Sequence, residues 1–417
     1  MNKNIWILNH YAKLGEGRHY KFSYNLARRG YNVKMFAAST RHNSDVNRII
    51  DNRKYIEEEM EGVTCIYIKA RSYIGNGKQR IFNMLDYAKG LLSVSKKFDK
   101  EKPDIIYASS VHPLTWLSGY ILSKRYKAKF IAETRDLWPE TLVAMGQIKK
   151  NSIPAKILYK LEKFIYKKAD RLIFTFPGGK DYVSNIGLDN SKVRYINNGI
   201  DIEEFNYNKG NYTYIDKDLE DNNIFKVIYT GSMGQANELG YLIKTAKLMQ
   251  EKEIRNIKLI LFGDGYQRKE LEDYAKENKL DNITFKGRVG KKHIPYILSK
   301  SNLNIIVGKD SVLEKYGFSQ NKIFDYLASG KPTISNRSVH SILDDNKCGV
   351  TVSNGSIEAI VTGILRIYKM QYAEYNQYCK NALKVVHDFD FKVLTDKLED
   401  IILELLTKEE AHANTTN

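Results

Sequence analysis

Short apolar runs alternate with longer amphipathic stretches along most of this chain. Residues 5–8 form an apolar run typical of a buried strand, and residues 18–29 place apolar side chains at helical spacing. A second apolar run at residues 33–37 completes a strand, helix, strand opening. Further short strands are expected at residues 104–108, 129–133 and 171–174. This order predicts a parallel sheet with helices on both faces.

The same alternation restarts in the second half. Strands are expected at residues 225–229, 258–262, 283–286 and 303–307, and helices at residues 237–250, 293–299 and 322–329. A chain of 417 residues also exceeds the usual size of one hydrophobic core. We therefore expect two doubly wound α/β domains, with a hinge near Asn198. The expected division is 1–198, 199–385 and a C-terminal part at 386–417, which contains an amphipathic helix at residues 393–406.

The cysteines and the ends of the chain bear on the compartment. Cys65, Cys348 and Cys379 are few and far apart, which argues against a disulfide framework and a structural zinc site. The N-terminus lacks the pattern of a signal peptide, and the apolar stretch at residues 105–122 contains polar residues. We expect a cytoplasmic protein with no spanning helix.

Positive charge is concentrated in the first half of the chain. The formal net charge is +17, and residues 1–200 carry 36 Lys and Arg against 18 Asp and Glu, whereas the remainder is nearly neutral. Such a division suggests that one domain meets a polyanion or an anionic surface. Nucleic acid and membrane both fit this pattern.

The segment SQNKIFDYLASGKP, residues 319–332, carries the most specific chemistry. Its apolar positions predict a helix on which Lys322 and Asp325, three residues apart, are neighbours on another face. A lysine and a carboxylate there suit a phosphorylated sugar, because the ammonium binds phosphate while Asp325 accepts ribose hydroxyls. The alternative is a surface helix with a weak ion pair.

Turns rich in glycine follow several of the expected strands, where open α/β sheets bind ligands. A structural turn explains each glycine equally well. The first domain has Gly15 and Gly17 in such a loop, and the second has Gly231, Ser232, Met233 and Gly234, then Gly263 and Gly265, then Arg288 and Val289.

These motifs together resemble the donor site of retaining family 4 glycosyltransferases of the GT-B fold. The resemblance implies two Rossmann-like domains with an interdomain cleft, and a C-terminal helix packing across the interdomain region. It also implies that the turns above bind a nucleotide-sugar, with Ser319, Asn321, Lys322 and Asp325. UDP is the nucleotide expected from the resemblance, and no cofactor is expected.

Two departures from the family pattern bear on the sugar. Typical members carry an arginine after the glycine that matches Gly231, where this chain has Ser232, and a glutamate where it has Gly317. A deoxy or N-acetylated sugar has fewer hydroxyls and would tolerate the loss of that glutamate. The sequence leaves the identity of the sugar, the acceptor and the linkage open.

The segment ETRDLWPE, residues 133–140, follows a strand of the first domain. With the segment ASSVHP at residues 108–113, it resembles a branch of family 4 that transfers N-acetylfucosamine-like sugars in bacterial surface polysaccharide synthesis, including capsule and O-antigen. The resemblance makes Asp136 the first candidate for the catalytic group near the sugar and His112 the second, although His112 also fits a structural role. Glu133 and Arg135 are further candidates, or an ion pair.

No metal is expected. Asp216 with Asp218, and Asp388 with Asp390, match an Asp-x-Asp pattern, but we interpret both as accidental.

Bacterial polysaccharide acceptors of this kind are carried on a polyprenyl diphosphate, so the basic domain is expected at the inner face of the cell membrane. Arg71, Lys78 and Arg80 are candidates for that side, and residues 153–168 read as a basic amphipathic helix. The apolar stripe of that helix equally fits a core.

Three other functions are alternatives to a glycosyltransferase. A nucleic-acid-binding protein fits the charge, but no such module is visible. A GT-B sugar-nucleotide 2-epimerase would share the donor fold, and a non-catalytic partner subunit would explain the missing glutamate.

Overall fold

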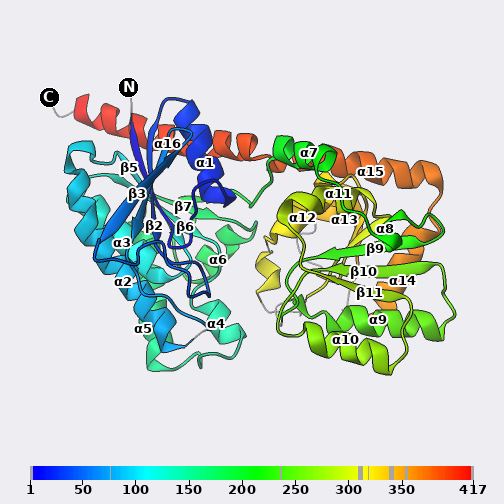
Figure 1. Ribbon diagram of the computed structural model, residues 1–417. Coiled ribbons are helices and arrows are strands. Elements are labelled where there is room, and N and C mark those ends of the chain that lie inside the picture. Colours follow the sequence, from blue (N-terminus) through cyan, green and yellow to red (C-terminus); the bar gives the residue numbers. More distant parts are fainter. Residues whose placement is uncertain are drawn as a thin grey trace. The chain divides into compact units, whose positions relative to one another are not determined.

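Two compact units make up the chain in the computed structural model, residues 1–198 with 391–417 and residues 199–390 (Figure 1). The structure describes residues 3–75, 77–234, 237–308, 313–317, 319–337, 342–352 and 356–414. Each unit is built on one sheet with helices packed against it, and is described by itself below.

The first unit contains an 8-stranded sheet in the order β3-β4-β2-β1-β5-β6-β7-β8. Its strands are β1 (Asn4–Leu8), β2 (Asn32–Ala38), β3 (Tyr55–Met60), β4 (Val63–Ile68), β5 (Ile105–Ser110), β6 (Lys129–Thr134), β7 (Arg171–Phe174) and β8 (Val193–Tyr195). Its helices are α1 (Gly17–Arg28), α2 (Lys78–Val94), η1 (Ser95–Glu101), α3 (Pro113–Tyr126), α4 (Glu140–Ala144), α5 (Ile153–Lys168), α6 (Gly179–Asn185) and α16 (Phe391–Asn414).

Both faces of this sheet are buried, because side chains alternate along each strand. Ile5 and Ile7 of β1 belong to one apolar cluster with Leu26 of α1 and Leu398 of α16. Trp6 points to the other face, where its ring lies 4.9 Å from that of Phe36. The expected parallel sheet with helices on both faces is therefore present.

One strand departs from the expected parallel order. β3 pairs antiparallel with β4 through a tight turn, in which Glu61 and Gly62 have φ of 51° and 79°. The sequence pattern missed β3 because it is YIEEEM, an edge strand whose glutamates keep it polar. The all-parallel expectation was incomplete at this edge.

The second unit contains a 6-stranded parallel sheet in the order β11-β10-β9-β12-β13-β14. Its strands are β9 (Phe225–Thr230), β10 (Ile257–Phe262), β11 (Ile283–Gly287), β12 (Leu303–Ile306), β13 (Thr333–Ser335) and β14 (Gly349–Thr351). Its helices are α7 (Ile202–Asn211), α8 (Lys217–Glu220), α9 (Gly240–Glu251), α10 (Arg268–Glu277), η3 (Lys291–His293), α11 (Ile294–Ser299), η4 (Glu314–Tyr316), α12 (Asn321–Ala328), α13 (Ile342–Asp345), α14 (Ile357–Tyr368), α15 (Tyr372–Val386) and η6 (His387–Phe389).

The end of the chain belongs to the first unit. The sequence suggested a separate part at 386–417, whereas residues 386–390 stay with the second unit and α16 packs on α1. Leu394, Leu398 and Ile402 of α16 are buried in the same cluster as β1 and β2. The first unit is thus assembled from two separate stretches of chain.

Strand order identifies where each sheet offers a crevice. In the first unit the chain winds outward from β1 to β2 and β4, then resumes on the other side at β5, and in the second unit β9 and β12 have the same relation. Ligands of doubly wound sheets bind outside the carboxyl ends of the strands at such a switch point. The residues that follow β1, β5 and β9 are therefore candidates for a ligand site.

Candidate functional site

Lys322 lies beside the turn that follows β9. Its Nζ donates to Tyr229 Oη at 3.0 Å and to Asn237 Oδ1 at 2.9 Å, and lies 4.3 Å from the centroid of the Tyr229 ring. A Cβ built on Gly231 would come within 3.0 Å of this Nζ. The helix and the turn that the sequence suggested separately are thus brought together.

Glycines of this region also have a packing role. A Cβ on Gly263 would lie 1.7 Å from the carbonyl oxygen of Gly231, and one on Gly265 would lie 2.3 Å from that of Met233. The turns after β9 and β10 therefore touch backbone to backbone. Such contact requires glycine whether or not a ligand is bound.

Two of the four residues in the first turn are engaged by the fold itself. The Gly231 amide donates to Phe262 O at 3.0 Å, and the Met233 amide donates to Asp264 O at 2.9 Å. The Met233 side chain is fully buried in the core of the second unit. We therefore correct the expectation for Met233, which anchors the turn rather than presenting its amide to a phosphate.

Lys322 and Asp325 face different neighbours. Burial lowers the pKa of Lys322 to about 7, and Arg337 lowers it further as a second cation nearby. Burial raises the pKa of Asp325 to about 6, with Lys291 opposing and Glu204 adding to that shift. Lys322 thus faces the turn after β9, and Asp325 lies toward the loop after β11.

The other candidates for donor binding are spread around the same edge of the sheet. Ser232 and Arg288 are exposed, and Val289 is half-buried against the core. Asn321 is exposed at the first residue of α12, and Ser319 is half-buried just before it. A Cβ on Gly234 would lie 3.3 Å from the exposed ring of Tyr266.

Asp136 follows β6 in the first unit, and its side chain is exposed. Arg135 is half-buried, and its amide donates to Ser110 Oγ at 3.3 Å. The segment after β6 is thus fixed to the end of β5. Burial raises the pKa of the Asp136 carboxyl above its ordinary value, and the nearby cations Arg135 and Arg80 oppose that shift. The role of Asp136 in binding or catalysis stays a prediction.

Glu133, in contrast, is a buried structural residue. Its carboxylate accepts hydrogen bonds from Arg18 Nε at 2.8 Å, His19 Nε2 at 2.8 Å and Tyr107 Oη at 2.5 Å. The side chain is fully buried, which by itself would raise its pKa, but the Arg18 guanidinium and the hydrogen bond from His19 hold the pKa of Glu133 well below the usual range. We withdraw Glu133 as a catalytic candidate, because all these partners come from the core of its own unit. Its ion pair is with Arg18.

His112 follows β5 and lies against a second histidine. His10 Nδ1 and His112 Nε2 are 2.7 Å apart, and both side chains are buried. Burial lowers the pKa of His10 to about 3, while burial and the adjacent His10 lower that of His112 well below its ordinary value. Both imidazoles are therefore neutral at physiological pH.

The three basic residues expected on one side of the first unit differ in their surroundings. Arg71 forms a bidentate pair with Asp86, at 2.6 and 2.9 Å, and Lys78 is exposed at the start of α2. Arg80 is half-buried, and its charge acts on His10, His42 and His112. Arg80 thus belongs to the edge of the sheet near His112 rather than to an outer surface.

Gly15 and Gly17 lie in the loop between β1 and α1. Their φ values of 82° and 80° are in the left-handed region, which explains glycine at both positions. A role for these glycines in binding stays a prediction.

Neither Asp-x-Asp pair points to a metal. Asp216 and Asp218 form ion pairs with Lys286, both at 2.6 Å, and Asp390 accepts from the Ile202 amide. Within the described ranges, no group of three His, Cys, Asp or Glu side chains gathers as metal ligands would.

Four contributors were missed by the sequence pattern. Tyr229 and Asn237 hold Lys322, while His10 lies against His112 and Asn83 acts on His10. Tyr229 is the fifth residue of an ordinary strand, and Asn83 lies inside a helix. Of these four, only His10, a polar residue two positions after the end of β1, carried a signal that strand position would have revealed.

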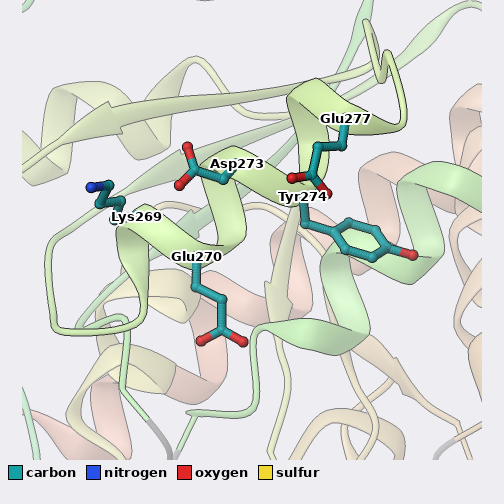
Figure 2. Close-up of a pocket in the computed structure, with 5 residues that line it drawn as sticks. All are labelled: Lys269, Glu270, Asp273, Tyr274 and Glu277. Carbon is teal, nitrogen blue, oxygen red and sulfur yellow. The ribbon is translucent and has the colours of Figure 1, made fainter.

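A shallow hollow elsewhere on the second unit does not belong to this site. Figure 2 shows that its lining comes from one helix, α10, with side chains pointing away from the helix axis into the open. The lining residues are Lys269, Glu270, Asp273, Tyr274 and Glu277. None of them was a candidate from the sequence, and acidic surface residues on a helix are ordinarily solvated.

Family models match both halves of the chain. Residues 20–204 match Glycosyltransferase Family 4, and residues 224–370 match Glycosyl transferases group 1. A probable glycosyltransferase of Pseudomonas aeruginosa, WbjE, is 20% identical over 248 residues, which is 59% of this chain. The aligned region spans 60% of the length of that relative.

Solved structures agree over nearly the full chain. Sucrose-phosphate synthase from Thermosynechococcus elongatus is 18% identical, with a TM-score of 0.71 over 98% of this chain and 100% of that one. The E. coli trehalose-6-phosphate structure bound with UDP-2-fluoro glucose is 10% identical, with a TM-score of 0.74 over 97% and 99%. HepE from Anabaena, in complex with UDP and glucose, is 13% identical, with a TM-score of 0.66 over 95% and 98%. The fold is GT-B.

Proposed function

We propose that this chain is a retaining, metal-independent glycosyltransferase that moves a sugar from a UDP-sugar to a lipid-linked saccharide. Matches of both halves to glycosyltransferase models support the activity. The N-acetylfucosamine-transferase-like branch, and with it a deoxy or N-acetylated sugar for capsule or O-antigen synthesis, is the finer part of this proposal. It rests on the segments at residues 108–113 and 133–140.

The position of Lys322 carries the proposal. Its ammonium lies next to the turn after β9, at the switch point of the second sheet. A departing diphosphate gains most from a cation that is already in place. To Asp325, on which Lys291 and Glu204 act, we assign the ribose hydroxyls.

Asp136 is the group we assign to the sugar side. Transfer from a nucleotide-sugar develops positive charge at the anomeric carbon, which a nearby carboxylate stabilises. Asp136 is exposed at the carboxyl end of β6, whereas the neighbouring Glu133 is enclosed by its own partners. We propose UDP as the nucleotide because the similar structures of HepE and of the E. coli protein contain UDP or a UDP-sugar.

The surface of α5 supports a membrane-associated acceptor. Ile153, Ile157 and Phe164 are 74%, 60% and 38% exposed, so the apolar stripe is not wholly core. Lysines 156, 160, 163 and 167 are exposed on the same helix. Exposed apolar side chains interleaved with lysines suit the headgroup region of an anionic bilayer. In the described ranges no helix has the length and apolar content needed to cross a membrane.

The donor assignment is tested by thermal shift and product analysis. We expect UDP to stabilise the protein, Lys322→Met to abolish this shift, and Lys269→Met, on the exposed face of α10, to preserve it. Mass spectrometry of lipid-linked saccharides should then show one added sugar with wild type and none with Asp136→Ala. Stabilisation by another nucleotide but not by UDP would overturn the donor assignment.

Membrane binding is tested separately. We expect the protein to sediment with vesicles containing phosphatidylglycerol at low salt, and Ile157→Asp to reduce the bound fraction several-fold. Ile215→Asp changes an isoleucine that is 91% exposed in the second unit and serves as the control. Equal binding by both variants would exclude α5 as the contact.

Two alternatives from the same fold give different results. A sugar-nucleotide 2-epimerase would convert a UDP-sugar without any acceptor. A non-catalytic partner subunit would leave cellular glycan unchanged when it carries Asp136→Ala. Transfer that depends on both the acceptor and Asp136 excludes both.

A further inference from the structure

A chain of buried polar side chains runs behind His112 in the first unit. His112 and His10 follow β5 and β1, the adjacent strands at the switch point of the sheet. Their Nε2 and Nδ1 atoms are 2.7 Å apart, and the two side chains are 1% and 0% exposed. Two neutral imidazoles can share such a contact only if one donates and the other accepts.

Asn83 of α2 decides which imidazole donates. Its Nδ2 donates to Thr40 Oγ1 at 2.9 Å and to the Arg71 carbonyl at 2.7 Å. The carbonyl can only accept, so the amide orientation is fixed and Oδ1 faces away from these partners. Asn83 acts on His10, and within the described chain Asn83 Oδ1 and His10 Nε2 are both buried atoms without a hydrogen-bond partner. An acceptor oxygen beside that ring favours a proton on His10 Nε2 over a bare nitrogen lone pair.

The proton positions then follow in order. Because Asn83 Oδ1 only accepts, His10 carries its proton on Nε2, and His10 Nδ1 is left as an acceptor. His112 must therefore donate from Nε2 to His10 Nδ1. This leaves an unprotonated Nδ1 on His112, a buried atom with no hydrogen-bond partner among the described residues.

The surroundings keep this chain neutral. Burial is the main effect on both rings, and the cation of Arg80 disfavours a second positive charge on either of them. The rings of Tyr11 and Tyr87 each lie 4.5 Å from that of His10, and His42 is the other titratable group that acts on it. A neutral His112 is a poor proton acceptor but a good hydrogen-bond acceptor.

We propose that Asn83 and His10 are positioning residues, which hold His112 as the Nε2–H tautomer so that its Nδ1 accepts a hydrogen bond from a substrate hydroxyl. A buried acceptor without a partner is unfavourable, and a bound hydroxyl would satisfy it. This proposal rests on the proposed glycosyltransferase function only in that the hydroxyl belongs to a substrate of that reaction. The tautomer itself is a property of the free protein.

The tautomer is measured by long-range ¹H–¹⁵N NMR of protein labelled at its eight histidines. Two histidines are internal references. His19 is held as Nε2–H because its Nε2 bonds Glu133, and His293 as Nδ1–H because its Nδ1 lies 3.0 Å from the carbonyl of Thr213. We expect His10 and His112 to resemble His19 at pH 7. A His112 signal that resembles His293, or a protonated ring, overturns the proposal.

Two substitutions of His10 separate positioning from packing. His10→Phe keeps a ring between Tyr11 and Tyr87 but removes the acceptor, so we expect His112 to lose its fixed tautomer and kcat to fall about tenfold. His10→Gln keeps an acceptor for His112 and a donor for Asn83, and should restore both. Loss of activity in His10→Gln equal to that in His10→Phe, or an unchanged His112 tautomer in His10→Phe, contradicts the proposal.

Nucleotide binding distinguishes this failure from failure of the proposed function. UDP is assigned to the second unit, so its thermal shift should be the same in wild type, His10→Phe and His10→Gln. If UDP does not stabilise wild type, the donor assignment fails while the tautomer result stands. If UDP binds but His112 resembles His293, the positioning proposal alone fails.

Discussion

Lys322 links nucleotide binding to pH. Its pKa in the free protein is lowered to about 7 by burial and then by Arg337. A bound diphosphate favours the protonated form, so binding above pH 7 must take up a proton, and Kd should rise up to about tenfold per pH unit. Calorimetry of UDP binding at pH 8, in two buffers of different ionisation enthalpy, measures this uptake.

An arginine at the same position provides the control. Lys322→Arg stays charged at all accessible pH values, so any UDP binding that it retains should show no proton uptake. Equal uptake by the variant and wild type would mean that another group titrates.

Glu162 makes stability depend on pH in the first unit. It is 1% exposed, and burial raises its pKa to about 8, although Tyr182 Oη donates to it at 2.9 Å. The carboxyl is neutral below the unfolded pKa and must ionise as pH rises through the folded one. Stability should therefore fall between about pH 4.5 and 8, by up to about 1.4 kcal/mol per pH unit.

Glu162→Gln should remove this dependence and unfold at higher denaturant concentration than wild type at pH 9. Glu270→Gln, exposed on α10, should leave the profile unchanged. If the free energies of unfolding of wild type and Glu162→Gln change equally with pH from 5 to 9, Glu162 does not titrate in this range.

At the scale of elements, the contact between the turns after β9 and β10 tolerates no side chain. A Cβ on Gly263 would lie 1.7 Å from Gly231 O, and the φ of Gly263 is 146°. Gly263→Ala should destabilise the protein by about 1 to 3 kcal/mol or more and weaken UDP binding, because the turn beside Lys322 must move. Gly240→Ala, at the start of α9 with nothing within 4 Å, should be neutral or stabilising. Equal melting temperatures of the two variants would refute the close approach.

Elements and their order were predictable because apolar period and turn residues act locally. The predicted boundaries of α5 (residues 153–168) and β7 (residues 171–174) match the structure at every residue, and those of α12 differ by one residue. The hairpin strand β3 was not, because its glutamates hide its period. Glu133 and Met233 show the same limit for the site, since position after or within a strand does not reveal which partners surround a side chain. His10 and Asn83 are 73 positions apart in the sequence, so they come into proximity only after the sheet has formed.

For the whole molecule, the first unit depends on the end of the chain. Leu398 of α16 is fully buried in the cluster that contains Ile5 and Ile7, whereas Leu403 of the same helix is 46% exposed. Leu398→Ala should cost about 2 to 5 kcal/mol and Leu403→Ala little, as measured by denaturant unfolding. A similar loss in both variants would mean that helix propensity rather than packing is responsible.

This dependence sets an order for synthesis on the ribosome. Residues 391–417 leave the exit tunnel only after all of residues 199–390 have been made. At typical elongation rates this interval lasts on the order of 10 to 40 s. During that time the nascent first sheet has no α16 against Ile5, Ile7 and Met35, so the second unit can mature first and chaperones have a defined apolar face to protect.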